Sequence, residues 1–338
     1  MSGRSNIASV ADRARTVAAG APVAGVYFLG RAAAFVLGEE ALLLVAEDGV
    51  QQRVPVHAGA ILSSASDTCR VLTGGDDGKV IATGPDGASE IISVDALNRW
   101  IDHVALAPDG TVAWSAGKQA FIQRRDGAAR RLDLPSTVGG LAFAPKGLRL
   151  AVAHYNGATL WFPNAKAEPD RLGWKGSHLA AAFSPDGRFL VTAMQEPVLH
   201  GWRLTDRQHM RMQGYAARVR SLDWTADGKW LATSGAGQLV LWPFQGKSGP
   251  MGKAPQLLAA AADEEGRVDV VACHPRHPIV AAGYADGLLL LVRIEDGAEI
   301  LARNPAASAV TALAWNADGS LLAFGTEDGD CGMLRNLG

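Results

Sequence analysis

Short apolar runs and polar turns alternate along the whole chain, and each apolar run is about four to eight residues long. The recurring unit is an apolar run, a turn that usually contains Asp-Gly, and a second apolar run. Asp-Gly supplies the positive φ angles of a tight hairpin, and runs of this length are typical of strands. The pattern therefore predicts an all-β chain. The clearest copies of the unit lie at residues 104–110, 141–147, 182–187, 222–228 and 313–319.

The unit repeats at a regular interval. A second loop and a third apolar run follow most copies, as in 155–157 and 159–162. Equivalent positions in the first strands are 37 to 49 residues apart, close to the length of a four-stranded propeller blade. We therefore predict a single closed β-propeller of four-stranded antiparallel blades, with eight blades expected and seven as the alternative. The aligned positions are Val23, Ile61, Ile101, Val138, His178, Val219, Val268 and Val310.

The ends of the chain and one long interval complete this prediction. The last repeat has only three strands, while residues 15–20 resemble a fourth strand, so the N-terminal strand is expected to close the last blade. Residues 1–14 are expected to form a flexible tail. The Gly- and Pro-containing segment 244–255 accounts for the longest interval and reads as an exposed loop insertion. Residues 1–338 are thus expected to form one propeller domain.

These features resemble the WD-repeat family over almost the whole chain. The Pro-Asp-Gly and Ala-Asp-Gly hairpins and the third-strand tryptophans Trp161, Trp202 and Trp242 carry the resemblance. The family's Trp-Asp dipeptide is absent, because these tryptophans precede Phe, Arg and Pro. The fold prediction does not depend on that dipeptide, since the apolar pattern and the turns carry it.

The resemblance also implies a hydrogen-bonded net within each blade, made of a histidine, a loop aspartate, a Ser or Thr and the tryptophan. His57 and Asp77 occupy the histidine and aspartate positions of one repeat, but that repeat has no tryptophan. Asp286 and Asp328 match the aspartate in other repeats. Tyr215 and Trp174 stand at histidine positions, so the net is expected to be degraded.

Composition and charge narrow the class of protein. The formal net charge is −2, which gives no general attraction to nucleic acid or to an anionic membrane. No apolar segment is long enough to span a membrane, and the N-terminus lacks a signal-like apolar stretch. The three cysteines are widely spaced and read as reduced thiols. These features predict a cytoplasmic protein, monomeric on its own, and the abundance of Ala, Gly and Arg suggests a bacterial source.

Candidate chemistry is sparse in this sequence. Cys273, His274 and His277 offer metal-ligand types, but a structural zinc site needs about four ligands, and a hairpin of one repeat explains this segment better. No nucleophile elbow, phosphate-binding loop or metalloprotease motif is present. We therefore expect no enzyme activity, no catalytic residues, no metal and no cofactor. The alternative is an enzyme or small-ligand propeller that uses the central channel, although the first strands carry mostly Val, Ala, Leu and Ser.

The expected function is a scaffold or adaptor that binds a protein or peptide on one face of the propeller. Residues beside the aligned first-strand positions, and in the loops around them, face one rim in the WD-repeat family. Aromatic residues and arginine are enriched at interface hot spots. Arg218, Arg220 and Arg267 lie on adjacent repeats and suit an acidic segment of a partner. The predicted partner-binding residues are Trp100, Asp102, Tyr215, Arg218, Arg220, Arg267, Asp269 and Tyr284.

Overall fold

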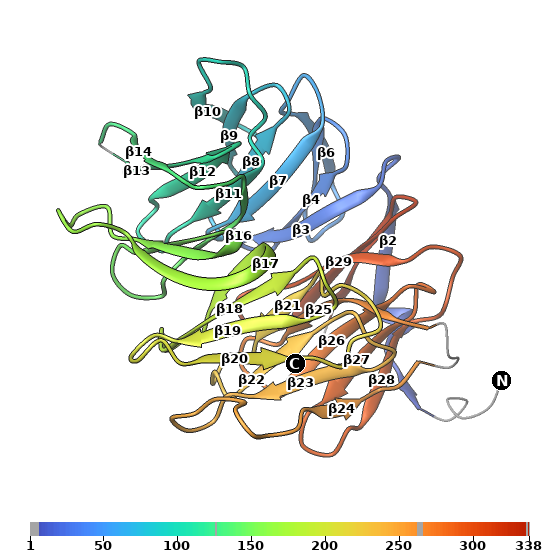
Figure 1. The fold of residues 1–338 in the computed structure, drawn as a ribbon. Helices are drawn as coiled ribbons and strands as arrows, with labels where there is room; N and C mark the ends of the chain where they lie inside the picture. The colour runs from blue at the N-terminus through green and yellow to red at the C-terminus, as the bar shows by residue number, and fades with distance from the viewer. Residues whose placement is uncertain (1–6, 126, 262–265, 336, 338) are drawn as a thin grey trace. The chain divides into compact units, whose positions relative to one another are not determined.

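The computed structural model describes residues 7–125, 127–261, 266–335 and 337. Almost all regular structure in these residues is antiparallel strand, and the one helical element in the described residues is the short 3-10 helix η1 (Ala11–Arg13). The all-β prediction is confirmed (Figure 1). The chain divides into two compact units, which are described separately below. The first holds residues 1–38, 42–53 and 214–338, and the second holds 39–41 and 54–213.

The first unit contains almost all of four sheets. In each, strands that are consecutive in sequence pair antiparallel. One sheet is β3 (Val23–Leu29), β4 (Ala32–Leu37), β5 (Ala41–Val45) and β6 (Gln51–Pro55). The second is β21 (Leu222–Trp224), β22 (Trp230–Thr233), β23 (Leu239–Pro243) and β24 (Gln256–Leu258). The third is β25 (Val268–Cys273), β26 (Ile279–Tyr284), β27 (Leu289–Arg293) and β28 (Glu299–Arg303). The fourth is β29 (Val310–Trp315), β30 (Leu321–Thr326) and β31 (Asp330–Arg335), joined by the N-terminal strand β2 (Ala14–Ala18).

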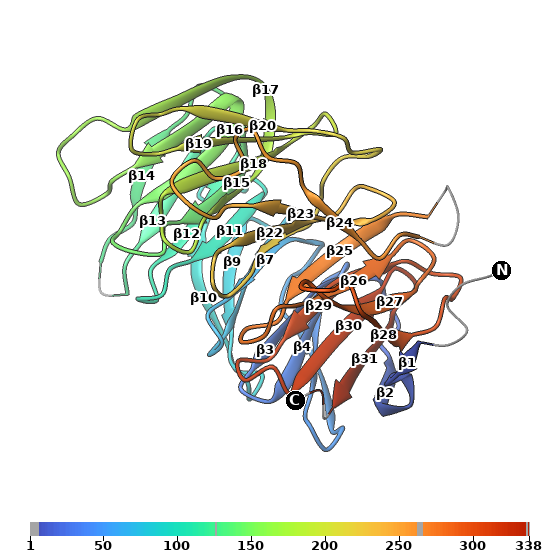
Figure 2. The same cartoon turned by 90° about the horizontal axis from the view of Figure 1, so that it is seen from below.

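The N-terminal segment takes part in two of these sheets. Strand β2 pairs antiparallel with β31, from Ala14 opposite Leu334 to Ala18 opposite Asp330 (Figure 2). The prediction that this strand completes the last blade is therefore confirmed. Just before it, β1 (Ala8–Ser9) adds a parallel fifth strand to β28. Within the segment 1–14 that was expected to be a flexible tail, residues 8–9 form β1 and residues 11–13 form η1, and residues 1–6 lie outside the described residues.

The second unit contains two four-stranded sheets and one six-stranded sheet. The first is β7 (Ile61–Ser66), β8 (Val71–Gly75), β9 (Lys79–Thr83) and β10 (Ser89–Val94). The second is β11 (His103–Leu106), β12 (Val112–Ala116), β13 (Gln119–Gln123) and β14 (Arg130–Asp133). The third is β15 (Val138–Phe143), β16 (Leu150–Trp161), β17 (Asp170–Phe183), β18 (Phe189–Met194), β19 (Leu199–Arg203) and β20 (His209–Met212).

The number of sheets differs from the predicted number of blades. The described strands form seven sheets, so the preference for eight blades is not supported and the alternative count of seven is the one observed. The difference arises in β16 and β17, which are 12 and 14 residues long. Strand β17 pairs with β16 through residues 170–177 and with β18 through residues 178–183, so two sequence repeats share one sheet. Strand pairing among the described residues does not link the seven sheets into a closed ring.

Apolar residues fill the space between neighbouring sheets within each unit. In the first unit, Leu239 and Leu241 of β23 pack with Val268 and Val271 of β25. In the second unit, Leu72 and Val80 pack with Val104 and Trp114 of the next sheet. Both faces of the middle strands are buried, which explains why these strands read as continuous apolar runs. No helix among the described residues is long and apolar enough to cross a membrane.

Segment 244–255 connects β23 to β24 through a series of turns. Residues Gln245 to Ser248 are exposed, as expected for an insertion. Phe244 is buried instead, and its ring packs edge-on against Trp224 at 4.6 Å between centroids. Gly249 and Pro250 in the middle of the segment are buried as well, so the segment is exposed only in part, at residues 245–248 and 252–254.

Candidate functional site

The residues that align between the sequence repeats occupy the same kind of position in the structure. All eight aligned first-strand residues are buried, with exposed fractions between 0 and 7%. In six of the repeats the strand register shifts by one residue directly after the aligned position. Such a bulge changes the direction of a side chain relative to the regular ladder. In these six repeats the residue after the aligned position, which is Asp269 in one of them, is therefore set apart from the buried face of its strand. The strand pairs of the repeats that carry Asp102 and Arg220 show no such shift in their described register.

Two loops of the first unit bring the predicted arginines together. Gly235, between β22 and β23, donates its backbone N–H to the carbonyl of Val268, and its own carbonyl accepts from Ala217. The segment that carries Arg218 is thereby tied to the segment that carries Arg267. Arg220 is exposed, and its backbone N–H donates to Ser234 Oγ at 3.2 Å. The predicted neighbourhood of Arg218, Arg220 and Arg267 is thus present in the backbone.

Arg267 does not present its full charge to solvent. Its Nε donates to Asp269 Oδ1 at 2.5 Å, and its Nη2 donates to Asp269 Oδ2 at 3.2 Å. This hydrogen-bonded ion pair raises the pKa of Arg267. The guanidinium is held beside the bulged Asp269, which partly neutralises it. Asp269 therefore positions Arg267, whereas Arg220 contributes an exposed cation.

Trp100 lies in an exposed loop of the second unit, between β10 and β11. Its exposed fraction is 61%, and that of Leu97 in the same loop is 74%. The Asp95 carboxylate shapes the loop, because its Oδ1 accepts from the backbone N–H groups of Leu97 at 2.9 Å and Arg99 at 3.1 Å. The Arg99 guanidinium donates to Asp95 Oδ2 at 2.6 Å and holds the pKa of that carboxyl below its usual value. The loop thus displays two large apolar side chains on a braced backbone.

Asp102, two residues further on, has a structural partner. Its Oδ2 accepts a hydrogen bond from the backbone N–H of Gly117 at 2.9 Å. Gly117 has a φ of 59° and makes the turn between β12 and β13. Asp102 therefore links the start of its first strand to that turn and is only partly exposed.

The structure corrects the placement of Tyr215 and Tyr284, which the sequence analysis put at the surface. Tyr215 is 8% exposed and Tyr284 is 1% exposed. The Tyr215 hydroxyl lies 2.8 Å from Thr233 Oγ1 and accepts from Trp242 Nε1 at 2.7 Å. The Tyr284 hydroxyl donates to the carbonyl of Ala259. Both rings therefore lie in the core, where each hydroxyl has the partners that a buried phenol needs.

These contacts show how the hydrogen-bonded net survives in altered form. In the first sheet of the second unit, His57 Nδ1 lies 2.8 Å from Asp77 Oδ1, and His57 Nε2 lies 2.9 Å from Thr73 Oγ1. In the sheet of Tyr215, the phenol replaces the histidine and reaches the Thr and Trp members of the net. The net of His57 and Asp77 lacks the tryptophan, and that of Tyr215 lacks the aspartate.

The Cys273 and His274 segment serves the fold. His274 Nδ1 accepts from the backbone N–H groups of Arg276 and His277, each at 3.0 Å, so its Nε2 donates to the carbonyl of Gly319 at 3.2 Å. The Cys273 thiol donates instead to the carbonyl of Asp223. With both ring nitrogens engaged, His274 shapes the turn before β26. Among the described residues, no group of three or more His, Cys, Asp or Glu side chains is arranged to hold a metal ion.

Two protein-family models match the chain. The WD domain, G-beta repeat model matches residues 207–243, which include Tyr215, Thr233 and Trp242. The model of the anaphase-promoting complex subunit 4 WD40 domain matches residues 271–336. Together with the sheets of antiparallel strands, these two matches support a WD-repeat propeller family for the chain. No curated protein matches the chain in sequence.

Two features of the described residues were not predicted from the sequence. Leu97 was overlooked because it lies between strands, outside the first-strand positions that the repeat alignment compares. A cavity lined by Arg70, Glu90 and Arg125 was overlooked because these residues come from three different strands and turns. The one sequence feature that could have pointed to this cavity is the pair Arg124-Arg125 directly after β13. A charged pair beside a hairpin turn is usually only a solvated surface, so it gave no prediction.

Proposed function

We propose that this protein is a non-catalytic scaffold that binds a protein partner through exposed loops beside its first strands. WD-repeat propellers generally act as protein-interaction scaffolds and are typically non-catalytic. The observation that carries the proposal is the loop 95–101, which displays Leu97 and Trp100 in solvent. An exposed tryptophan on a rigid backbone loses little conformational entropy when it is buried by a partner. This loop is the main contact site proposed for the second unit.

The arginine-bearing loops of the first unit form the second proposed contact site. Arg220 is exposed, and the backbone of Gly235 connects the loops that carry Arg218 and Arg267. Guanidinium groups in such a cluster suit the carboxylates of an acidic segment. Tyr215 and Tyr284 are left out of the proposed contact site because both are buried, while Asp102 and Asp269 position the loops.

Affinity capture from the native cell extract, followed by mass spectrometry, tests the proposal. We expect Leu97→Ala with Trp100→Ala to lower recovery of the partner at least about tenfold, because hot-spot residues contribute 2 kcal/mol or more. Val50→Ala is the matched control, since Val50 is 65% exposed but lies outside the proposed contact sites. Thermal unfolding of all variants should stay close to that of the wild type. Equal recovery with the double variant and the control would remove the loop from the proposal.

The arginine site needs its own variant. Exchanging Arg218, Arg220 and Arg267 for Glu should abolish capture of a partner that uses an acidic segment. Because the partly exposed ion pair of Arg267 with Asp269 is lost, the unfolding temperature should fall slightly. The control exchanges Lys118, Lys146 and Lys166, all exposed, for Glu and so matches the change in net charge. Unaltered capture by the arginine variant, or equal losses in both variants, would rule out this contact site.

A further inference from the structure

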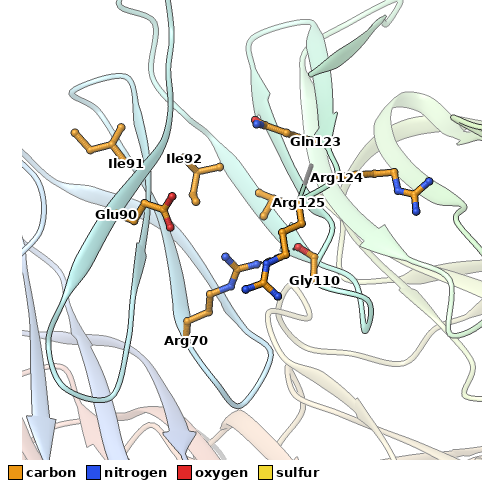
Figure 3. Close-up of a pocket in the computed structure, with 9 residues that line it drawn as sticks. Arg70, Glu90, Ile91, Ile92, Gly110, Gln123, Arg124 and Arg125 are labelled. Carbon is orange, nitrogen blue, oxygen red and sulfur yellow. Dashed lines mark hydrogen bonds between the residues drawn. The ribbon is translucent and has the colours of Figure 1, made fainter. Parts of the chain in front are cut away.

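A cavity of about 390 Å³ opens between two neighbouring sheets of the second unit (Figure 3). One wall comes from the turn after β7, which carries Arg70, and from the outer strand β10, which carries Glu90, Ile91 and Ile92. The opposite wall comes from the turn between β11 and β12 and from the end of β13 with Arg125. Residues from two repeats therefore build one site, which no single repeat could provide.

Arg70 is fixed within this cavity. Its Nη2 donates to the carbonyl of Gly110 in the next sheet at 3.0 Å, and its Nε lies 3.3 Å from Asp67 Oδ2. Asp67 Oδ1 in turn accepts from the backbone N–H of Arg70 at 3.0 Å. The Arg70 side chain is 26% exposed. Its charge is thus held at the cavity by contacts to both sheets.

Arg125 points toward Arg70 from the other side of the cavity that both residues line (Figure 3). Two like charges at close range repel unless a negative charge lies near both. Glu90 turns its carboxylate toward the same space from β10 (Figure 3), where Ser89, Glu90 and Ile91 are all exposed. The Arg124 side chain points away from the two guanidinium groups although Arg124 borders the cavity (Figure 3).

The apolar part of the cavity lies along β10. Ile91, which is 56% exposed, and Ile92 line this wall, and Val94 further along the strand is 55% exposed. Strand β10 is also the edge strand of its sheet. Exposed apolar residues on an edge strand beside two cations suit an extended ligand that alternates apolar and acidic groups. A single small oxyanion would use only the charged end of this space.

We infer that the cavity between β10 and β13 binds an acidic peptide segment of a protein partner, with a carboxylate between Arg70 and Arg125 and an apolar side chain against Ile91 and Ile92. This inference rests on the proposed scaffold function for the class of partner, but it uses neither the 95–101 loop nor the arginine loops of the first unit. Glu90 competes with the ligand carboxylate for the two guanidinium groups.

Fluorescence anisotropy on the full-length chain tests the inference. The probe is a rhodamine-labelled octapeptide of alternating Leu and Glu, compared with the same peptide of alternating Leu and Lys and with competition by inorganic phosphate. We expect saturable binding of the Leu-Glu peptide, none of the Leu-Lys peptide, and displacement by phosphate only at concentrations far above the peptide Kd. Binding of phosphate without binding of the peptide would overturn the assignment of a peptide ligand and leave a small-oxyanion site.

Neighbouring residues provide matched variants. Arg125→Gln should weaken peptide binding about tenfold, because one charge-assisted hydrogen bond contributes roughly 1.5 kcal/mol. Arg124→Gln removes the same charge one residue away and should change the Kd less than about twofold, as expected for an exposed charge outside the contact. Glu90→Gln should strengthen binding by removing the competing carboxylate. Equal losses in Arg124→Gln and Arg125→Gln, or weaker binding in Glu90→Gln, would overturn the site.

The outcome is separable from that of the proposed function. Failure of the peptide to bind, with capture still dependent on Trp100, would refute this cavity alone. Equal capture by the Leu97→Ala, Trp100→Ala variant and the Val50→Ala control, with peptide binding still dependent on Arg125, would refute the contact site at loop 95–101 and leave the cavity site standing. Variants at Arg70 are avoided because its hydrogen bonds to Gly110 and Asp67 hold two turns in place.

Discussion

Tyr215 illustrates how a single side chain replaces a member of a buried hydrogen-bonded net. Its hydroxyl reaches both Thr233 Oγ1 and Trp242 Nε1, and all three side chains are buried. An unpaired indole N–H in such a place would cost free energy because it has lost its water. The Tyr215 phenol therefore provides the acceptor that the buried Trp242 N–H needs. The sequence suggested a surface contact at Tyr215 because it shows an aromatic residue in a loop but not the buried partners of its hydroxyl.

The exchange Tyr215→Phe removes only this hydroxyl. We expect it to lower the free energy of unfolding by about 1–3 kcal/mol, because Trp242 Nε1 and Thr233 Oγ1 lose their common partner in the core. Urea unfolding followed by tryptophan fluorescence measures the change. Tyr155→Phe is the control, since Tyr155 is 57% exposed and should change the free energy by less than about 0.5 kcal/mol. Similar values for the two variants would show that the buried hydroxyl does not stabilise the sheet.

At the scale of elements, strand β2 joins the beginning of the described chain to its end. It pairs with β31 over five residues, and β31 is buried at Cys331, Gly332, Met333 and Leu334. Without β2, the backbone groups and apolar side chains of β31 would form an exposed sheet edge. Strand β1 covers β28 in a similar way, but over two residues only. The two segments therefore differ in the area that they protect.

Two truncations separate these contributions. Deleting residues 1–18 should lower the unfolding temperature by about 10 °C or more and cause aggregation, because one whole strand pairing is lost. Deleting residues 1–9 removes β1 and should have a much smaller effect. Thermal scans with light scattering measure both. If the longer deletion fails to fold, Thr16→Pro offers a milder test, since Thr16 pairs with Gly332 in the middle of the strand. Equal stability of both deletions would contradict the assigned role of β2.

Across the whole molecule, buried histidines link stability to pH. Burial lowers the pKa of His103, His154, His178, His200 and His274, and it lowers that of His200 to about 3. His200 is fully buried, and its ring stacks on Trp174 at 4.1 Å between centroids. Neither of its ring nitrogens has a hydrogen-bond partner in the described part of the chain. The unfolded chain binds protons at these residues below about pH 6.5, whereas the folded chain resists them.

Stability is therefore fully present above about pH 6.5 and is lost as the pH falls toward 3. Asp223 acts in the opposite sense, because burial raises its pKa to about 6, but it is one group against five. We expect the free energy of unfolding to fall between pH 7 and pH 5, with His200 contributing about 1–2 kcal/mol. In His200→Leu this decrease should be smaller by that amount, while His277→Gln, at an exposed histidine, should keep it. Denaturant unfolding at several pH values measures the slope, and a wild-type slope in His200→Leu would contradict the assignment.

Much of the fold could be predicted from local features. Turn residues such as Asp109 and Gly110 fix hairpins, and their repetition fixes the interval, so the strands, the aligned buried positions and the pairing of β2 with β31 were expected from the sequence. The count of sheets was not, because the continuity of β16 and β17 through two repeats depends on how neighbouring strands pair. The local pattern indicates where a strand can begin, but it does not indicate whether that strand runs on into the next repeat and pairs there.

The same distinction between local pattern and tertiary contact applies to the residues of the candidate sites. The sequence by itself determined that Trp100 and the arginines flank first strands, because a repeat of fixed length sets those positions. Only the tertiary structure decided that Tyr215 is buried and bonded to Trp242, that Asp269 holds Arg267, and that Arg70 and Arg125 line one cavity between two sheets. Burial and the approach of charges depend on contacts between residues far apart in the chain, which no local pattern encodes.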